Sequence, residues 1–379
     1  MDLQDLRLEI DDINKKIVDL LCRRMDISVD VAKYKTEHDL PVLNTAREDD
    51  ILRCVKQASK AYNDRYEDII PLVFSSILDS SRALQYPYVD KDENFSDIIE
   101  NAQKNRAKDD VKIVCQGTAG AFSHIAALSL FEDIEPSFVD SFEDVFESVK
   151  NGDADYGIVP VENSNAGSVN EVYDLIINSK FYIIDALTLP VEHCLVVCRG
   201  AKLADITDVY SHPQALSQCA EFLKKNHMHT HGYVNTAVAA KMIADSGDIT
   251  KAAIASKLAA QKHGLDIVAE KIQNSSKNCT RFVVISRDLV IPENANKISL
   301  TFALPHITGS LYRTLSRFAM AGLNLTKLES RPLHDENFTY LFYLDFEGSI
   351  QKNYVDELMS ALSAEMEKFT FLGHYHEIC

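Results

Sequence analysis

Residues 3–36, LQDLRLEIDDINKKIVDLLCRRMDISVDVAKYKT, decide the fold of the N-terminal part of the chain. Apolar residues recur along this stretch in alternating steps of three and four, which is the heptad pattern of a long amphipathic helix. The members of this apolar stripe are Leu3, Leu6, Ile10, Ile13, Ile17, Leu20, Ile27, Val31 and Tyr34. Because Pro41 follows, we expect one helix that ends near Asp39 and is roughly 55 Å long.

The apolar stripe is too long to be buried by the two shorter helices that the sequence predicts next, at about 45–62 and 64–86. A partner chain would cover it, so we expect a homodimer or a dimer of dimers. Residues 1–88 are therefore predicted to form an all-α dimeric domain. The polar residues 89–110 lack a sustained period, which predicts a linker.

Two further domains are predicted beyond the linker. Residues 111–288 alternate short apolar runs, such as VKIVC, YGIVPV and FVVIS, with helical stretches such as TAVAAKMIADS. This rhythm favours an α/β domain with a largely parallel sheet. Residues 296–379 follow the order strand, helix, strand, strand, helix, strand, which is the βαββαβ order of an α+β ferredoxin-like domain. The chain is thus predicted to be multidomain.

Composition excludes several classes of function. The chain has 39 Lys and Arg against 57 Asp and Glu, and its formal charge of −18 disfavours nucleic acid as a partner. It has no continuous apolar run of the length that spans a membrane, and its charged N-terminus does not resemble a signal peptide, so we expect a cytoplasmic protein. The eight cysteines include no CxxC pair, which disfavours a zinc site or a disulfide framework.

One position interrupts the apolar stripe, because Arg24 stands where the heptad pattern requires an apolar residue. A guanidinium on an apolar face is costly unless an anion meets it. Lys35 lies three turns further along and only about 20° around the helix, so both cations can reach a ligand between them. Arg7 is about 42 Å from Lys35 along one helix and could share a site only with Lys35 of an antiparallel partner. The alternative is that all three are solvent-facing cations.

The strings LxxLR, IDDINKKIVDLLCRR, a following lysine, R-E and S-RALQ together resemble the all-helical AroQ-type chorismate mutases over essentially all of residues 1–86. The resemblance implies the rearrangement of chorismate to prephenate. It also implies a substrate-binding set in which cations hold carboxylates, Lys35 and Gln85 stabilise the breaking ether oxygen, and Glu48 holds the ring hydroxyl. The cations that would hold the carboxylates are Arg7 of the partner, Arg24 and Arg47.

A serine belongs to the same implied site. Ser81 has the family spacing to Gln85, whereas Ser80 has the family's neighbour Asp79, so both remain candidates, with Ser81 preferred. Asn44 stands where the family commonly has aspartate. A pericyclic rearrangement requires no acid, base or metal, only a folded substrate conformer and charge placed at the developing enolate oxygen.

Polar residues follow the apolar runs of residues 111–288. QGTAGAFSHIAA is a glycine-rich turn that enters a helix, where anions bind. VPVENSNAGSV and VYSHPQALSQC carry polar residues just beyond a strand, and NCTRFVVIS carries them at a strand start. These are Glu162, Asn163, Ser164, Ser211, His212, Gln214, Thr280 and Arg281. Ligands of open α/β sheets bind at strand ends, although each motif taken singly is more often a turn or a cap.

The four strings occur in family order and resemble prephenate dehydratase. The resemblance implies two α/β lobes with the site in the cleft between them, and loss of CO₂ and hydroxide from prephenate to give phenylpyruvate. Thr280 would act as the proton or hydrogen-bond donor to the leaving hydroxyl, and Arg281 would hold a carboxylate or orient Thr280. The implied polar lining is Asn163, Ser211 and Gln218. For His212 and His124, a structural role is favoured over an acid role.

The C-terminal strings HITGSLYRTL and LTKLESRP resemble the ACT domain that is fused to prephenate dehydratases. This implies an L-phenylalanine effector bound between two ACT domains, with feedback inhibition. The implied effector-binding residues are Gly309, Leu311, Glu329, Ser330 and Arg331. Ser310 replaces an alanine of the family's GALV string. The alternative is a dimerisation domain without a ligand.

The three resemblances fall in the order of the bifunctional chorismate mutase/prephenate dehydratases, often called P-proteins. The resemblance implies an enzyme of phenylalanine biosynthesis that needs no metal and no organic cofactor. Two alternatives remain open. The dehydratase could prefer arogenate, or residues 1–86 could serve only dimerisation.

Overall fold

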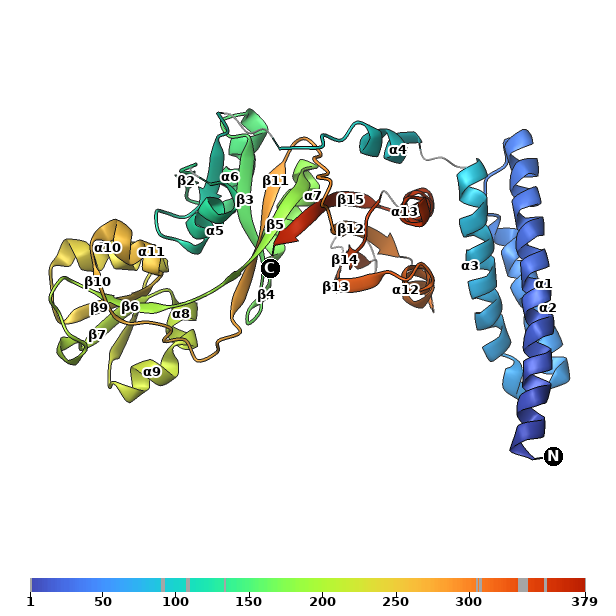
Figure 1. The fold of residues 1–379 in the computed structure, drawn as a ribbon, viewed down its shortest axis with the longest axis horizontal. Helices are drawn as coiled ribbons and strands as arrows, with labels where there is room; N and C mark the ends of the chain where they lie inside the picture. The colour runs from blue at the N-terminus through green and yellow to red at the C-terminus, as the bar shows by residue number, and fades with distance from the viewer. Residues whose placement is uncertain are drawn as a thin grey trace. The chain divides into compact units, whose positions relative to one another are not determined.

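The computed structural model describes residues 2–89, 93–106, 110–132, 134–304, 306, 309–332, 340–350 and 353–378. The chain forms two compact units (Figure 1). The first contains Met1–Asn101 and Lys297–Phe371, and the second contains Ala102–Asn296 and Leu372–Cys379. Each unit is described by itself below.

The first unit begins with the long helix that the sequence predicts. Helix α1 spans Leu3–Glu37 and starts at a capping box in which Asp2 and Asp5 bond each other's backbone N–H. Helix α2 spans Thr45–Tyr62, a short turn η1 covers Asp64–Tyr66, and α3 spans Ile69–Val89. Helix α3 packs against both α1 and α2. The predicted end of the first helix, before Pro41, is confirmed.

The apolar stripe of α1 is not covered within one chain. Every large apolar residue of the predicted stripe, from Leu3 to Tyr34, is exposed, with Leu20 at 67%. Only Ser28 and Ala32 of this helix are buried. Exposed apolar faces of this kind are typical of surfaces that pack against another protein chain.

The rest of the first unit follows the predicted βαββαβ order. Its elements are α4 Glu93–Glu100, β12 Lys297–Leu304, α12 Ser310–Met320, β13 Asn324–Pro332, β14 Tyr340–Glu347, α13 Asn353–Glu365 and the start of β15 Thr370–Ile378. Strand β14 pairs antiparallel with both β12 and β13, so β13 lies beside β14 and away from β12. The predicted linker is only partly irregular, because Phe95 of α4 packs edge-on against Phe369 and Phe371.

The second unit has two α/β lobes. The first lobe contains β1 Ile113–Gln116, α5 Phe122–Leu130, β2 Ser137–Val139, α6 Phe142–Asn151, β3 Tyr156–Asn163, β4 Gly167–Ser168, α7 Asn170–Ser179, β5 Tyr182–Pro190 and β11 Cys279–Ser286. Its sheet has the order β5-β11-β3-β1-β2, with β4 paired to β3. Helix α5 packs on this sheet around a core that includes Ile113, Ala127 and Ile158.

The second lobe is formed by the chain between β5 and β11. It contains β6 Cys194–Val197, η2 Leu203–Asp205, β7 Asp208–Ser211, α8 Pro213–Gln218, α9 Ala220–Lys225, β8 His229–Gly232, α10 Thr236–Ser246, β9 Lys251–Ala255, α11 Lys257–His263 and β10 Asp266–Ala269. Its sheet has the order β10-β6-β9-β7-β8. Apolar clusters cover both faces, one around Leu195 and Val209 and the other around Val196 and Ala240.

The expectation of a largely parallel sheet is wrong, because both sheets are mixed. Strand β1 pairs in parallel with β2 and β3, but β11 runs antiparallel to both β3 and β5. In the second lobe β7 is parallel to β8 and β9, whereas β6 is antiparallel to β9 and β10. The reason is topological. The chain leaves the first lobe through β5 and returns through β11, which must run in the opposite direction to lie beside β5.

None of the helices in the described part of the chain is both long and apolar enough to cross a membrane.

Near residue 103 the predicted linker again has a fixed position. Gln103 exchanges backbone hydrogen bonds with Leu289 and Ile291, and the Arg106 guanidinium lies over the Phe131 ring and 3.1 Å from the Asp185 carboxylate.

Candidate functional site

A first cluster of the predicted residues gathers where α1 packs on α3. Arg24 Nη1 donates to the Ser81 hydroxyl, and Lys35 Nζ donates to Gln85 Oε1 at 3.0 Å. Gln85 Nε2 in turn donates to the Ser81 carbonyl oxygen at 3.1 Å. The helical period places Ser81 and Gln85 on one face of α3, opposite the two cations of α1. Four predicted residues, far apart in sequence, therefore form one polar cluster.

Ser80 does not belong to this cluster. Its hydroxyl donates to the Ser76 carbonyl oxygen at 2.8 Å, on a different face of α3 from Ser81. Burial lowers the pKa of Arg24 and the nearby Glu48 carboxylate opposes this effect, but an arginine pKa starts so far above neutrality that the guanidinium stays charged. The cationic groups of Arg24 and Lys35 thus flank the two uncharged side chains of Ser81 and Gln85.

The remaining cations of the predicted set are not brought to this cluster within one chain. Arg7 and Arg47 are both exposed. Arg7 lies on the first turns of α1, about 42 Å along the helix from Lys35, so no side-chain rotation can bring the two together.

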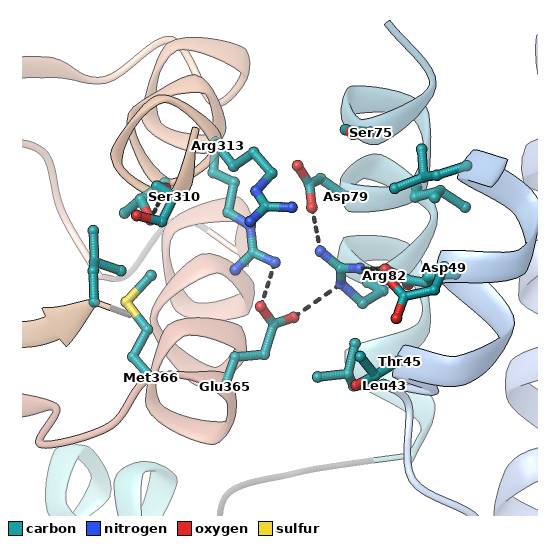
Figure 2. Close-up of a pocket in the computed structure, with 16 residues that line it drawn as sticks. Leu43, Thr45, Asp49, Ser75, Asp79, Arg82, Ser310, Arg313, Glu365 and Met366 are labelled. Carbon is teal, nitrogen blue, oxygen red and sulfur yellow. Dashed lines mark hydrogen bonds and ion pairs between the residues drawn. The ribbon is translucent and has the colours of Figure 1, made fainter. Parts of the chain in front are cut away.

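Glu48 already has a protein partner, Arg82, which sequence analysis did not select. The Arg82 guanidinium contacts the carboxylates of Glu48 and Asp79, and its Nε lies 3.2 Å from Glu365 of α13 (Figure 2). Arg317 of α12 binds the second oxygen of Glu365 at 2.5 Å. These residues line a cavity of about 360 Å³ within the first unit. The signal was present in the sequence, because Arg82 lies in the quoted string S-RALQ.

A second cluster lies in the second unit, where the chain passes between the two lobes. Thr280 is the second residue of β11 and stands directly opposite Asn163, the last residue of β3, in the antiparallel ladder. Asn163 Nδ2 lies 2.9 Å from Thr280 Oγ1 and 3.1 Å from Asn278 Oδ1. The predicted pair thus makes direct side-chain contact across two neighbouring strands.

The second cluster extends from Thr280 into the interior. Asn278 Nδ2 donates to Gln218 Oε1 at 3.1 Å, and the same oxygen lies 2.9 Å from His193 Nε2. Asn278 and His193 are buried, each at 2% exposure, whereas Thr280 is half-buried. Sequence analysis missed His193 and Asn278. Asn278 stood within the quoted string NCTRFVV, but His193 followed no motif.

The two segments that join the lobes hold this cluster in place. His193 lies on the segment that leaves β5, and Asn278 on the segment that enters β11. The backbone bonds these segments together, since Val191 N donates to Asn278 O at 2.8 Å and Ile272 N donates to His193 O at 3.0 Å. The hydrogen-bonded side chains from His193 to Thr280 are therefore held by the two backbone segments that connect the lobes.

The orientation of the Asn163 amide follows from its backbone partners. The backbone N–H groups of Asn165 and Ala166 donate to Asn163 Oδ1 at 3.1 and 3.0 Å. Since an N–H can only donate, Oδ1 is the acceptor and Nδ2 must face Thr280. The Thr280 oxygen therefore accepts a hydrogen bond, and its own O–H is directed elsewhere.

The implied role of Arg281 does not fit its position. Neighbouring residues of a strand point to opposite faces, so Arg281 points away from the face that carries Thr280. Its guanidinium binds the Glu377 carboxylate at 2.7 Å and the Tyr375 hydroxyl at 2.6 Å, both on β15. Both charged side chains are largely buried, at 11% and 7% exposure. A guanidinium paired in this way stabilises the sheet and is not oriented toward a ligand beside Thr280.

Ser211 also differs from the expectation. It is fully buried at the end of β7, and its hydroxyl donates to the Ile254 carbonyl oxygen at 2.7 Å across the sheet. The hydroxyl is therefore engaged inside the second lobe and is not part of the chain of residues that ends at Thr280. The implied polar lining is thus reduced to Asn163 and Gln218.

The favoured structural reading of two histidines agrees with the coordinates. His212 caps α8, where its Nδ1 accepts from the Gln214 N–H at 3.3 Å. His124 is completely buried, and its Nδ1 accepts from the Gly120 N–H at 3.0 Å. Gly120 itself packs against α11 so closely that a Cβ there would lie 2.5 Å from the Ala259 Cα. This glycine-rich turn therefore serves close packing between the lobes.

The predicted effector residues lie on α12 and β13. Gly309 caps α12 with φ +83°, a left-handed conformation that strains any other residue, and Leu311 of the first turn is half-buried. On β13, Glu329 and Arg331 alternate with Ser330, so Ser330 faces the opposite side of the sheet. Arg331 lies over the Tyr343 ring at 5.9 Å. Along the described strand β13, Ser330 therefore lies on the face opposite to the one shared by Glu329 and Arg331.

Within the described ranges, no group of three or more His, Cys, Asp or Glu side chains is arranged to hold a metal ion. The first polar cluster consists of two cationic side chains, a hydroxyl and an amide, and the second consists of amides, a hydroxyl and an imidazole. Such groups act by hydrogen bonding and by placing charge.

Comparisons with known proteins agree with this division of the chain. Residues 6–86 match the family model of chorismate mutase type II, and residues 113–289 match that of prephenate dehydratase. The chain is 30% identical to the bifunctional chorismate mutase/prephenate dehydratase of Escherichia coli (strain K12), over 98% of this chain and 95% of that protein.

Two further relatives each match 70% of the chain. The arogenate dehydratase/prephenate dehydratase 1 of Arabidopsis thaliana is 37% identical, over 70% of this chain and 72% of that protein. The crystal structure of the Arthrobacter aurescens prephenate dehydratase in complex with L-Phe is 29% identical, with a TM-score of 0.64, over 70% of this chain and 89% of that one.

Proposed function

Because the chain belongs to the family of bifunctional chorismate mutase/prephenate dehydratases, we propose that its two polar clusters are the two active sites. The protein is an enzyme of phenylalanine biosynthesis that converts chorismate to prephenate and prephenate to phenylpyruvate. We assign the mutase to residues 1–88, the dehydratase to 111–288 and an ACT regulatory domain to 296–379. The observation that carries the assignment is that residues singled out by sequence meet in both clusters, Arg24 and Lys35 with Ser81 and Gln85 in the first, and Asn163 with Thr280 in the second.

In the proposed mutase site, Arg24 binds a substrate carboxylate and Lys35 and Gln85 face the ether oxygen. As the carbon–oxygen bond of chorismate breaks, negative charge develops on that oxygen, and the Lys35 ammonium stabilises it. Chorismate carries two carboxylates, so a second cation is needed. Arg7 of a partner chain is the candidate, because the exposed stripe of α1 offers a surface on which an antiparallel copy can pack.

In the proposed dehydratase site, Thr280 donates a hydrogen bond to the hydroxyl that leaves prephenate. The electron pair of the broken bond to CO₂ moves into the ring, the ring becomes aromatic, and hydroxide departs. A threonine hydroxyl is a weak acid, so it stabilises the leaving oxygen by a strong hydrogen bond or relays a proton to it. The Asn163 amide supports this role, since it donates to the Thr280 oxygen and does not take up the Thr280 O–H as an acceptor.

We also propose that residues 296–379 adopt the ferredoxin-like ACT fold and bind L-phenylalanine. The βαββαβ element order supports the fold, and the L-Phe complex of the Arthrobacter aurescens relative supports the ligand. An effector that binds one quaternary state more tightly shifts the population toward it, so L-phenylalanine would act as a feedback inhibitor. Gly309 and the string Glu329–Arg331 are the residues we expect to contribute.

A coupled assay tests the whole assignment. Purified enzyme given chorismate should release prephenate and then phenylpyruvate without added metal or cofactor, and L-phenylalanine should lower the rate of phenylpyruvate formation. The two reactions are followed separately, by chorismate consumption and by phenylpyruvate absorbance. Conversion of prephenate without consumption of chorismate would mean that the helical domain serves only dimerisation.

Arogenate is a second candidate substrate, because the Arabidopsis relative carries both activities in its name. Arogenate has an amino group where prephenate has a keto group, and its product would be phenylalanine itself. Comparison of kcat/KM for the two substrates at equal enzyme concentration distinguishes them.

The shared mutase site predicts complementation between two inactive variants. Arg7→Ala and Lys35→Ala should each lose mutase activity alone. When the two variants are co-expressed with different tags, half of the dimers combine both chains, and about one quarter of all sites become intact. Recovery to about that fraction is expected in the chorismate assay. No recovery, with heterodimers shown by sequential tag purification, would place both residues in sites of a single chain.

A further inference from the structure

His193 is the buried end of the hydrogen-bonded chain that leads to Thr280. It lies on the segment that connects β5 to β6 and is 2% exposed, and the Phe122 ring of the first lobe packs edge-on against its imidazole at a centroid distance of 5.7 Å. Its Nε2 lies 2.9 Å from Gln218 Oε1. No other side-chain partner of the imidazole is found in the described part of the chain, where Nδ1 is buried without a hydrogen bond.

The direction of every hydrogen bond in this chain follows from the backbone at its far end. The N–H groups of Asn165 and Ala166 fix Asn163 Oδ1 as an acceptor, so Asn163 Nδ2 donates to Asn278 Oδ1. Asn278 then has only its Nδ2 left to donate to Gln218.

The same reasoning extends to the imidazole. Gln218 Oε1 accepts from Asn278, so the atom that faces His193 is an acceptor, and His193 Nε2 must carry the hydrogen. A neutral ring can meet this requirement with Nδ1 unprotonated. A charged ring would also place an N–H at the buried Nδ1, where no partner is found among the described residues. Burial lowers the pKa of His193, which is consistent with the neutral form.

We propose that His193 is a positioning residue of the dehydratase, whose Nε2–H fixes the Gln218 amide and, through Asn278 and Asn163, the orientation of the Thr280 hydroxyl. The proposal rests on the assigned role of Thr280. The backbone N–H groups of Asn165 and Ala166 set the direction of the hydrogen bonds at one end of the chain, and the Nε2–H of His193 holds the Gln218 oxygen in place at the other end. His193 touches no reacting atom in this account and acts only through its neighbours.

The test compares two substitutions at position 193 in the full-length enzyme. His193→Leu keeps a similar volume but removes the donor, whereas His193→Gln keeps an N–H at about the place of Nε2. We expect His193→Leu to lower kcat for prephenate by about tenfold with KM changed less than about twofold, and His193→Gln to retain most of kcat. Mutase activity of the same chain should be unchanged. His263→Leu is the matched control, because His263 is a partly buried histidine that is not part of the hydrogen-bonded series from His193 to Thr280.

Two further measurements keep the outcome decisive. If His193 acts through Thr280, the double variant His193→Leu/Thr280→Val should be no slower than Thr280→Val alone. If His193→Leu does not fold, His193→Asn replaces it, since its shorter amide cannot reach Gln218.

Wild-type kcat in His193→Leu, or in His193→Asn where that variant replaces it, would overturn the role of His193. A rise in KM with kcat unchanged would overturn it too. Loss of activity that is equal in His193→Leu and His193→Gln would overturn it as well. A fully active Thr280→Val variant would instead refute the assigned dehydratase site. The two failures are therefore distinguishable.

Discussion

Replacement of Thr280 by valine is expected to lower kcat for phenylpyruvate formation by about 10²–10⁴-fold, the usual contribution of a positioned proton donor. Valine has nearly the same shape as threonine and suits a strand, but it has no O–H to give to the leaving hydroxide. The Asn163 amide would also lose its acceptor at Oγ1. KM for prephenate should change little, because the lost interaction is formed mainly as the carbon–oxygen bond breaks.

Two controls accompany the Thr280→Val measurement. Thr280→Ser keeps the hydroxyl and should retain kcat to within about tenfold, since only a methyl group is lost. Chorismate consumption by the Thr280→Val enzyme should equal that of wild type, which shows that the first unit is intact. Phenylpyruvate formation at the wild-type rate would remove Thr280 from the mechanism.

Replacement of Lys35 by methionine is expected to lower mutase kcat by about 10²–10³-fold, which is the typical cost of losing one group that stabilises developing charge. Methionine keeps most of the length and apolar stem of lysine. It cannot donate to Gln85 Oε1, which lies 3.0 Å from Lys35 Nζ, and it places no positive charge near the ether oxygen.

Lys33→Met is the matched control for Lys35→Met. Lys33 lies on the same helix but is exposed, and it pairs with Asp30 at 2.9 Å. Exposed pairs of this kind contribute little to stability, so this variant should retain mutase activity. Both variants should keep full dehydratase activity. Equal mutase rates in the two variants would exclude a special role for Lys35.

Local patterns allowed most elements to be predicted. The alternation of three and four along α1 and the stop before Pro41 are properties of neighbouring residues, and both were confirmed. The βαββαβ order of the C-terminal segment was likewise readable from short apolar runs. The predicted parallel sheet was wrong because strand direction depends on how the chain returns through β11, which no local period records.

The positions of Arg281 and Ser211 were also beyond local reasoning. Arg281 directly follows Thr280 of the second cluster, and Ser211 lies in the same sequence string as Gln218 of that cluster. Alternation along β11 turns Arg281 to the face where Glu377 lies. At the end of β7, the Ser211 hydroxyl is buried and donates to Ile254 of the neighbouring strand β9. A sequence motif identifies residues that are neighbours along the chain, whereas the alternation of side chains along the strand sets which face of the sheet each residue occupies.

By itself, the sequence determined the helical stripe of α1, the order of the elements and the chemical types of the residues at the two sites, because each of these depends on spacing within a few turns or strands. Only the tertiary structure decided which of those residues meet. Asn163 and Thr280 lie 117 positions apart, and the register between β3 and β11 sets them opposite each other. His193 and Arg82 gained their partners in the same way. Such contacts depend on the packing of distant segments, and a single sequence holds no local signal for that packing.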